Sequence, residues 1–309
     1  MKVRTVLGDI DPADLGVCDA HDHLFFASKL LPGQELDDPD AAERELIAFK
    51  AAGGSALVQW TPFGLNRRTS ELVELSRSTE VHVVAATGLH RAEHYSALDG
   101  VIDRLAEVFV ADLTEGTQLS DDPAEPRTGP KAGLIKVAGA FHTVDAHARL
   151  TMTAAATAHH ATGAPIAVHL ELGTAALEVA SLLCDDLEVP PDRVILGHLN
   201  RNPDQRLQRE IAERGTFLGF DGPSRANHAT DWRLPESLEA LVETGHAGQI
   251  LLGGDTTTAA ARASSGGGPG IPYLLTTLRP RLAKLLGEDV VTGMLVANPA
   301  RAFAAAWPG

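Results

Sequence analysis

The sequence predicts an α/β protein that folds as a closed (β/α)8 TIM barrel. Eight short apolar segments have the character of buried strands, and amphipathic segments with helical spacing alternate with them. Residues of metal-binding type end both the first and the last apolar segment, which favours a ring that brings these two strands together. With 309 residues, 44% of them hydrophobic, the chain can form one large core, and we expect a single domain over residues 1–309.

The predicted strands and helices follow one another along nearly the whole chain. The predicted strands cover residues 17–24, 55–61, 82–89, 133–139, 165–170, 193–199, 216–221 and 250–255. Segments between them, such as AAERELIAFKAAG and PESLEALVETG, carry apolar residues at helical spacing and end in glycine, as helix C-caps often do. Strand and helix repeated eight times over about 250 residues is typical of this barrel.

The two ends of the chain and two long loops complete this arrangement. The first fifteen residues are expected to form a short strand or hairpin before the barrel, and the tail AFAAAW to end a last helix on the barrel floor. Residues 116–131 and 256–272 are polar, glycine- and proline-rich loops. The second loop directly follows the last strand, where a lid over the substrate would lie.

An open, doubly wound sheet is the structural alternative. It is disfavoured because no GxGxxG motif opens the first strand-to-helix turn. It would also separate the first and last strands, which carry the presumed ligands.

Composition excludes several classes of function. Lys and Arg total 26 against 41 Asp and Glu, a formal charge of -15, and no basic run could neutralise a phosphate backbone, so we expect no nucleic-acid binding. Two cysteines cannot build a disulfide framework, and MKVRTVLGDIDP lacks the apolar core of a signal peptide, which favours a cytoplasmic enzyme. No apolar run approaches the roughly 20 residues needed to span a bilayer, so membrane insertion is not expected.

Histidines and an aspartate stand where predicted strands end. His21 and His23 are separated by one residue, so on a strand both imidazoles would face the barrel mouth and could hold one metal ion. His169 and His198 end two further strands. Asp255 ends the last, where a buried carboxylate would be costly unless paired or bound to a cation. HxH alone is a weak signal, but these five residues and Lys136, which closes the fourth predicted strand, together predict a metal-dependent hydrolase with its site at the carboxyl ends of the strands.

Lys136 closes the fourth predicted strand and has two interpretations. A lysine there could extend to the surface along its flexible stem. A desolvated amine loses its proton more easily and can react with carbon dioxide to form a carbamate. Four histidines, one aspartate and a bridging carbamate would supply enough ligands for two ions roughly 3.5–4 Å apart.

The order of these residues resembles the phosphotriesterase-related family of the amidohydrolase superfamily. HxH ends strand one, lysine strand four, histidine strands five and six, and aspartate strand eight. The likeness extends over almost the whole chain, through LGDIDPADLG, TGLH, IKVA, GHLNRNPD, LLGGD and VANPARAF. The family more often has glutamate between its first two histidines, so Asp22 is a departure that leaves the ligands in place.

The resemblance implies a role for each matching position. His21, His23 and Asp255 would hold the more buried ion, His169 and His198 the more exposed one, and carbamylated Lys136 would bridge them together with a hydroxide. Asp255 would accept the proton of that hydroxide and pass it to the leaving group, so Asp255 and Lys136 are the expected catalytic residues. Zinc suits nitrogen-rich sites, and manganese or cobalt could replace it. A homodimer is also expected from the resemblance.

The loops favour a polar, sugar-type lactone, possibly phosphorylated, as the small-molecule substrate. Family members that act on acyl-homoserine lactones or organophosphates tend to place Tyr or Trp after the TG(L/I) of strand three, whereas this chain has His90. The loops resemble the branch that opens sugar lactones. Six residues are candidates for substrate binding. They are His90, Arg91, Tyr95, Arg225, Arg262 and Trp60.

The candidates for substrate binding each have a structural alternative. The three arginines could bind a carboxylate or phosphate through their planar fork of donors, or each could be an ordinary surface arginine. Trp60 could form an apolar wall, and core packing would explain it equally well.

Other functions stay open at this point. An organophosphate hydrolase with the same metals would turn over an aryl phosphotriester faster than any lactone. A non-catalytic binding protein on a degenerate barrel would stay inert after metal loading. A mononuclear deaminase would bind one ion and leave Lys136 unmodified.

Overall fold

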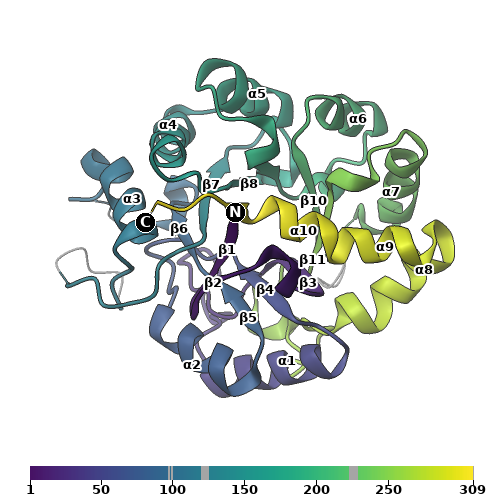
Figure 1. Ribbon diagram of the computed structural model, residues 1–309, viewed down its shortest axis with the longest axis horizontal. Helices are drawn as coiled ribbons and strands as arrows, with labels where there is room; N and C mark the ends of the chain where they lie inside the picture. Colours follow the sequence, from purple (N-terminus) through teal and green to yellow (C-terminus); the bar gives the residue numbers. More distant parts are fainter. Residues whose placement is uncertain (97, 99, 120–124, 223–228, 309) are drawn as a thin grey trace.

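The computed structural model describes residues 1–96, 98, 100–119, 125–222 and 229–308 as a ring of strands inside a ring of helices (Figure 1). The strands are β1 (Lys2–Thr5), β2 (Gly8–Ile10), β3 (Cys18–Asp22), β4 (Ala56–Gln59), β5 (His82–Val84), β6 (Ala86–Gly88), β7 (Leu134–Gly139), β8 (Ile166–Leu170), β9 (Val194–Leu196), β10 (Phe217–Asp221), β11 (Ile250–Gly253) and β12 (Ala304–Ala305). The α-helices are α1 (Pro39–Ala51), α2 (Thr69–Thr79), α3 (Leu105–Thr114), α4 (Ala146–Thr162), α5 (Ala176–Ala180), α6 (Gln205–Glu213), α7 (Leu234–Glu243), α8 (Arg279–Leu286), α9 (Glu288–Leu295) and α10 (Ala297–Ala302).

The parallel strands close into a barrel. β3, β4 and β5 pair in that order, and β6 to β11 pair in chain order. β5 and β6 are two halves of one segment interrupted at Ala85, whose carbonyl accepts a hydrogen bond from Gly133 N at 2.9 Å. The last strand returns to the first, because Asp255 N donates to the carbonyl of His21 at 2.9 Å. Eight strand segments therefore form a ring, and the predicted barrel is confirmed.

Alternate side chains of the strands point into the barrel. The lower ones fill its interior, and the last ones lie at its mouth. One buried cluster combines inward-facing strand residues with residues from the two ends of the chain. It includes Val3, Cys18, Ala20, Val58, Leu134, Ala167, Phe217, Leu251 and Phe303. Because side chains on a strand alternate, the inward positions that follow Leu134, Ala167 and Leu251 are occupied further up by Lys136, His169 and Asp255. The same alternation that packs the core thus delivers polar groups to the mouth.

β3 departs from regular alternation. Its pairing with β4 shifts register between Asp19 and Asp22, as a β-bulge does. The irregularity lets Ala20 lie in the barrel interior while the His21 ring also faces inward and stacks on Trp60 at 3.6 Å between ring centroids.

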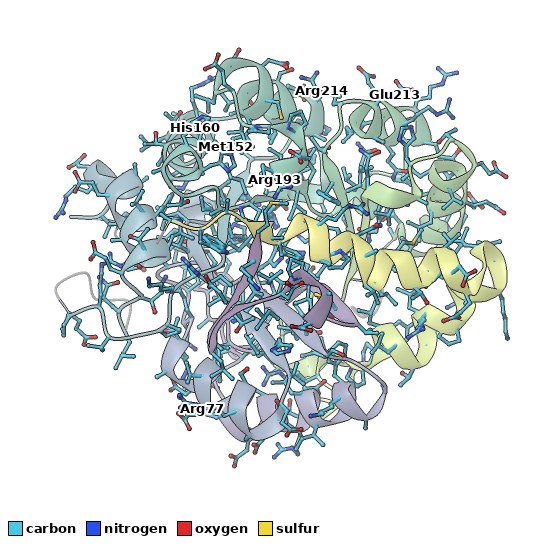
Figure 2. All side chains as sticks on the ribbon, in the orientation of Figure 1. Arg77, Met152, His160, Arg193, Glu213 and Arg214 are labelled. Carbon is cyan, nitrogen blue, oxygen red and sulfur yellow. The ribbon has the colours of Figure 1, made fainter. Side chains whose placement is uncertain are left out.

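Three of the described helices begin at aspartate side chains that cap them. Asp38, Asp145 and Asp204 each accept a hydrogen bond from the first turn of α1, α4 and α6, respectively. α4 ends at Gly163 in the left-handed conformation, as its position after the periodic segment predicts. Figure 2 shows charged side chains such as Arg77 and Arg214 at the outer edge of the helical ring.

The barrel floor confirms one prediction and corrects another. β1 and β2 form the expected hairpin. The tail was expected to end a helix, but α10 ends at Ala302 and β12 pairs antiparallel with β1, with Val3 opposite Ala304. This pairing satisfies backbone groups that the edge of a two-stranded hairpin would leave free. No described helix is long and apolar enough to cross a membrane.

The loop after β11 is tied to α1. The buried carboxylate of Glu45 accepts backbone hydrogen bonds from Ser264 at 2.7 Å and Ile271 at 2.9 Å. This loop was expected to be a lid. Its contacts hold it against the first βα unit beside the barrel mouth.

Candidate metal centre

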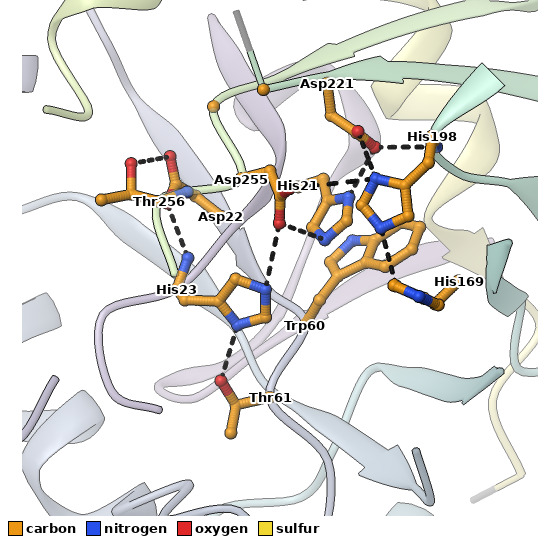
Figure 3. Close-up of polar contacts among 12 residues, drawn as sticks. His21, Asp22, His23, Trp60, Thr61, His169, His198, Asp221, Asp255 and Thr256 are labelled. Carbon is orange, nitrogen blue, oxygen red and sulfur yellow. Dashed lines mark hydrogen bonds and ion pairs between the residues drawn. The ribbon is translucent and has the colours of Figure 1, made fainter. Parts of the chain in front are cut away.

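The carboxyl ends of the strands surround a cavity of about 340 Å³. Its lining combines the predicted ligands with residues of the loops after β3, β6 and β8. The lining residues are His21, His23, Phe26, Leu30, Leu31, His90, Arg91, Glu93, His94, Lys136, His169, Glu171, His198, Asp255 and Thr257. All six predicted metal ligands therefore face one cavity, although they come from five different strands or strand ends. Figure 3 shows the four histidines and Asp255.

One group of ligand atoms surrounds the carboxylate of Asp255. Oδ1 of Asp255 lies 3.6 Å from Nε2 of His21 and 3.6 Å from Nε2 of His23. Nδ1 of His21 donates to Asp221 at 2.7 Å, and Nδ1 of His23 donates to Oγ1 of Thr61 at 2.8 Å. Thr61 in turn donates to the carbonyl of Phe25 at 2.5 Å, so its oxygen accepts from the histidine. In the neutral rings both Nε2 atoms are therefore unprotonated, and their lone pairs point toward Asp255.

A second group of ligand atoms joins His169 and His198. Nε2 of His198 lies 2.7 Å from Nδ1 of His169, while Nδ1 of His198 donates to Oδ1 of Asp221 at 2.5 Å. On its far side, Nε2 of His169 donates to Oε2 of Glu171 at 3.0 Å. Each of the four imidazoles thus has an oxygen acceptor behind it and its other nitrogen toward the centre, the arrangement that metal-binding histidines usually have.

Asp221 and Glu171 were not predicted from the sequence. Asp221 accepts hydrogen bonds from two histidines, and the ligand atoms of His21, His198 and Asp221 lie within 4.8 Å of one another. Its position offered a signal, because it ends an apolar strand as Asp255 does. Glu171 had a weaker signal: it lies two residues after His169 in a loop.

An unusual backbone conformation orients the side chains of two predicted ligands. His198 and Asp255 lie two residues beyond the ends of β9 and β11 and have φ of 63° and 51°, in the left-handed region. Asp and His tolerate this region better than most residues, although it still costs on the order of 1–3 kcal/mol. A Cβ on Gly253 would lie 2.7 Å from the carbonyl oxygen of His21, and one on Gly254 2.1 Å from Oδ2 of Asp22. The motif LLGGD therefore lets the last strand approach the first closely.

The charges of the site suit a cation. Burial lowers the pKa of His23 to about 4 and of His169 to about 3, so both rings are neutral near pH 7 and offer lone pairs. Burial also opposes charge on His198, but Asp221 and Asp255 outweigh it and raise the pKa of that ring. One ligand atom each of His21, His23 and Asp255 lies within 4.8 Å of the other two. Buried nitrogen and oxygen donors so arranged fit a divalent cation such as zinc.

Lys136 lines the cavity and is buried, with 2% of its surface exposed. Desolvation lowers the pKa of its amine to about 7, although Asp255 opposes this effect. The side chain does not extend to the surface, so the surface interpretation of this lysine is wrong.

Two predicted substrate-binding residues line the cavity wall. His90 stacks on His94 at 4.1 Å between ring centroids and meets the edge of His169 at 4.5 Å. Arg91 forms ion pairs with both Glu93 and Glu171. The guanidinium is therefore already engaged by two carboxylates.

Three other predicted substrate-binding residues lie elsewhere. Trp60 is buried, stacks on the His21 ring and donates to the carbonyl of Ala20 at 2.8 Å, so it packs behind a predicted ligand and does not line the cavity. Tyr95 accepts from His90 N at 2.8 Å and lines a neighbouring cavity with Phe63 and Lys29. Arg262 is buried and donates to the carbonyl of Leu24, which joins the last loop to the first. Arg225 lies outside the described residues.

Comparisons with known proteins agree over nearly the whole chain. The model of the Phosphotriesterase family matches residues 1–303. A phospho-furanose lactonase of Mycoplasmopsis synoviae is 31% identical over 322 residues, which cover 97% of this chain and 91% of the relative. A lactonase from Listeria monocytogenes has a crystal structure with a TM-score of 0.90 at 27% identity, covering 99% of each chain. An amidohydrolase from Mycoplasma synoviae reaches 0.91 at 30% identity, covering 98% of this chain and 92% of that one.

Proposed function

This chain belongs to the phosphotriesterase family, and we propose that it is a metal-dependent hydrolase that opens a polar, sugar-type lactone. The observation that carries the proposal is the convergence of four buried imidazoles and the Asp255 carboxylate on one cavity, with each ring held from behind by an oxygen. Relatives whose names identify them as lactonases support the proposal that the hydrolysed bond is the ester bond of a lactone.

His21, His23 and Asp255 would hold one cation, and His169 and His198 the other. Zinc suits these donors, with manganese or cobalt as substitutes. Two such ions would supply Lewis-acid chemistry, because they lower the pKa of water and polarise a carbonyl oxygen.

Lys136 would join the two halves of the site as a carbamate. Its buried amine lies in the cavity with the other ligands. The amine nitrogen would form a bond to the carbon of carbon dioxide and release one proton, and the resulting anion offers two oxygens where the free amine offers one nitrogen.

Asp255 would move the proton in the reaction. Its Oδ1 faces His21 and His23, and its Oδ2 lies 3.9 Å from Nδ1 of His198, so the carboxylate borders both groups of histidines. We assign to it the acceptance of a proton from the attacking water and its delivery to the ring oxygen, as the bond between that oxygen and the carbonyl carbon breaks. The product is a hydroxy acid, which ionises and releases a proton.

The cavity walls favour a polar ring. Arg91, Glu93, Glu171, His90 and His94 present charged or hydrogen-bonding groups on the wall formed by the loops after β6 and β8. Phe26, Leu30 and Leu31 from the loop after β3 also line the cavity and could contact the carbon side of the ring. A hydroxylated lactone presents both kinds of surface.

The test is turnover of a substrate panel by the metal-loaded protein, followed by a pH indicator. The panel contains sugar lactones, phosphorylated sugar lactones, an acyl-homoserine lactone and one aryl phosphotriester. The proposal predicts that a sugar-type lactone is turned over fastest. A phosphotriester that exceeds every lactone would replace the lactone assignment with the organophosphate alternative.

A further inference from the structure

Glu171 connects the wall of the cavity to a presumed ligand. It opens the short turn that follows β8, and its carboxylate lies between the ring of His169 and the guanidinium of Arg91. Oε2 accepts from Nε2 of His169 at 3.0 Å and forms an ion pair with Nη1 of Arg91. About a quarter of the Glu171 side chain is exposed, so water screens this contact only in part.

The hydrogen bonds on the outer nitrogens of His169 and His198 determine whether the two inner nitrogens, which face each other, carry protons or lone pairs. Asp221 holds the proton of His198 on Nδ1, and Glu171 holds the proton of His169 on Nε2, because a carboxylate can only accept. When both rings are neutral, the two remaining nitrogens face each other at 2.7 Å and both carry lone pairs. Two lone pairs at this distance repel unless they share a cation.

Without Glu171, this arrangement is no longer fixed. A neutral imidazole can carry its proton on either nitrogen, and the hydrogen bond made by one nitrogen selects which. If His169 carried the proton on Nδ1, it would donate directly to Nε2 of His198. Neither nitrogen would then have a lone pair available for a cation. The carboxylate behind the ring excludes this alternative.

We propose that Glu171 is a positioning residue that reserves Nδ1 of His169 for one of the two divalent cations, and that Arg91 holds Glu171 in place. The inference rests on the proposed function, in which His169 and His198 hold one ion. It also changes the expected role of Arg91. With both carboxylate partners engaged, Arg91 acts through Glu171 and not on an anionic group of the substrate.

The test is stepwise zinc binding to the full chain, measured by competition with a chromophoric chelator, for wild type and Glu171→Gln. The amide keeps the size of the side chain but can donate as well as accept, so it no longer enforces one tautomer. We expect about 10–100-fold weaker binding of one ion, since loss of a partner behind a ligand typically has this effect, and a change of less than about twofold for the other.

Glu93→Gln is the matched control. Glu93 pairs with the same guanidinium and lines the same cavity but does not contact His169. It should bind both ions within about twofold of wild type. Arg91→Met is a second variant, which removes the residue that holds Glu171. It should weaken the same ion as Glu171→Gln, by a smaller factor.

A spectroscopic measurement separates positioning from a general loss of structure. In the zinc-loaded protein, long-range 1H–15N correlation spectra should show His169 with its proton on Nε2. In Glu171→Gln at sub-saturating zinc, a second His169 tautomer should appear, with unchanged circular dichroism. Equal zinc affinity for both ions in wild type and Glu171→Gln, or equal weakening of both, overturns the inference while leaving the proposed function intact. A wild-type chain that binds no zinc overturns both.

Discussion

Each of the four imidazoles predicted as ligands has one nitrogen hydrogen-bonded to an oxygen on its outer side, so its other nitrogen is directed to the centre. Three acceptor residues serve this purpose: Asp221 and Glu171 through their carboxylates, and Thr61 through its hydroxyl. An aspartate shared by two histidines needs fewer buried charges than two separate partners would. At this scale the site is defined by orientation as much as by residue type.

Asp255 supplies the first prediction. Asp255→Asn keeps the shape of the side chain but removes its capacity to accept a proton at neutral pH. We expect turnover of the preferred lactone to fall by at least about 10²–10⁴-fold, the usual contribution of a general base, with unchanged circular dichroism. Asp192→Asn, a substitution at an exposed aspartate, is the control and should keep the wild-type rate. Wild-type turnover by Asp255→Asn would remove Asp255 from the mechanism.

Lys136 supplies the second prediction. Lys136→Ala removes the side chain that would carry the bridging carbamate, so we expect the purified protein to lose bound metal and activity together. A short-chain carboxylic acid can place two oxygens in the space left behind and should restore part of the activity. Lys131→Ala, at an exposed lysine five residues earlier, should leave both properties unchanged. Full metal content in Lys136→Ala would exclude the bridging role.

At the scale of elements, the barrel closes where β11 approaches β3. Gly253 and Gly254 permit this approach, since either Cβ would overlap atoms of the first strand. The bulge in β3 works together with it by turning both His21 and His23 toward Asp255. The closure of the ring and the assembly of the ligands thus depend on the same few residues.

The glycine pair gives a third prediction. The methyl group of Gly254→Ala would lie 2.1 Å from Oδ2 of Asp22, so the buried carboxylate or the strand end must shift. We expect a loss of about 1–3 kcal/mol in the free energy of unfolding, measured by urea denaturation. Gly293→Ala is the opposite control: this position in α9 has nothing within 4 Å of a new Cβ, so alanine should stabilise the helix by about 0.5–1 kcal/mol. A Gly254→Ala variant as stable as wild type would show that the close approach is not required.

Strand ends could be predicted from the sequence because each apolar run stops at a polar residue, and a parallel barrel gathers these ends. This reasoning located Lys136, His169 and Asp255 at one cavity, although their roles stay predictions. It could not place Arg262 or Tyr95, because loop residues have no periodicity that fixes where their side chains point. Trp60 was ambiguous for another reason: it closes a strand, but the bulge in β3 brings the His21 ring over it.

The tail shows a further limit of sequence reasoning. AFAAAW has the composition of a helix end, yet its backbone completes the sheet that begins at β1. Pairing between residues about 300 positions apart in the chain overrides local helix propensity, which is a weak preference. In the same way, Asp221 became recognisable only when His21 and His198 were seen on either side of it.

For the whole molecule, metal binding should increase the free energy of unfolding. Ligands that bind only the folded state stabilise it, by about 2.7 kcal/mol when the free ion is at 100 times its Kd. For a chain of this size, removal of the ions by a chelator should lower Tm by about 5–10 °C, as measured by differential scanning calorimetry. Lys136→Ala, which is expected to lack metal already, should show little change. Equal Tm values for wild type with and without chelator would contradict a site that binds the ions tightly.

The most direct measurement is the metal content of the purified chain by elemental analysis, combined with proton release from a sugar-type lactone by the same sample. We predict two divalent ions per chain and rapid acid release, both lost after chelation and both restored by zinc. A chain that opens the lactone equally well with no bound metal, or that binds no metal when zinc is supplied, would contradict the proposal that this is a metal-dependent lactone hydrolase.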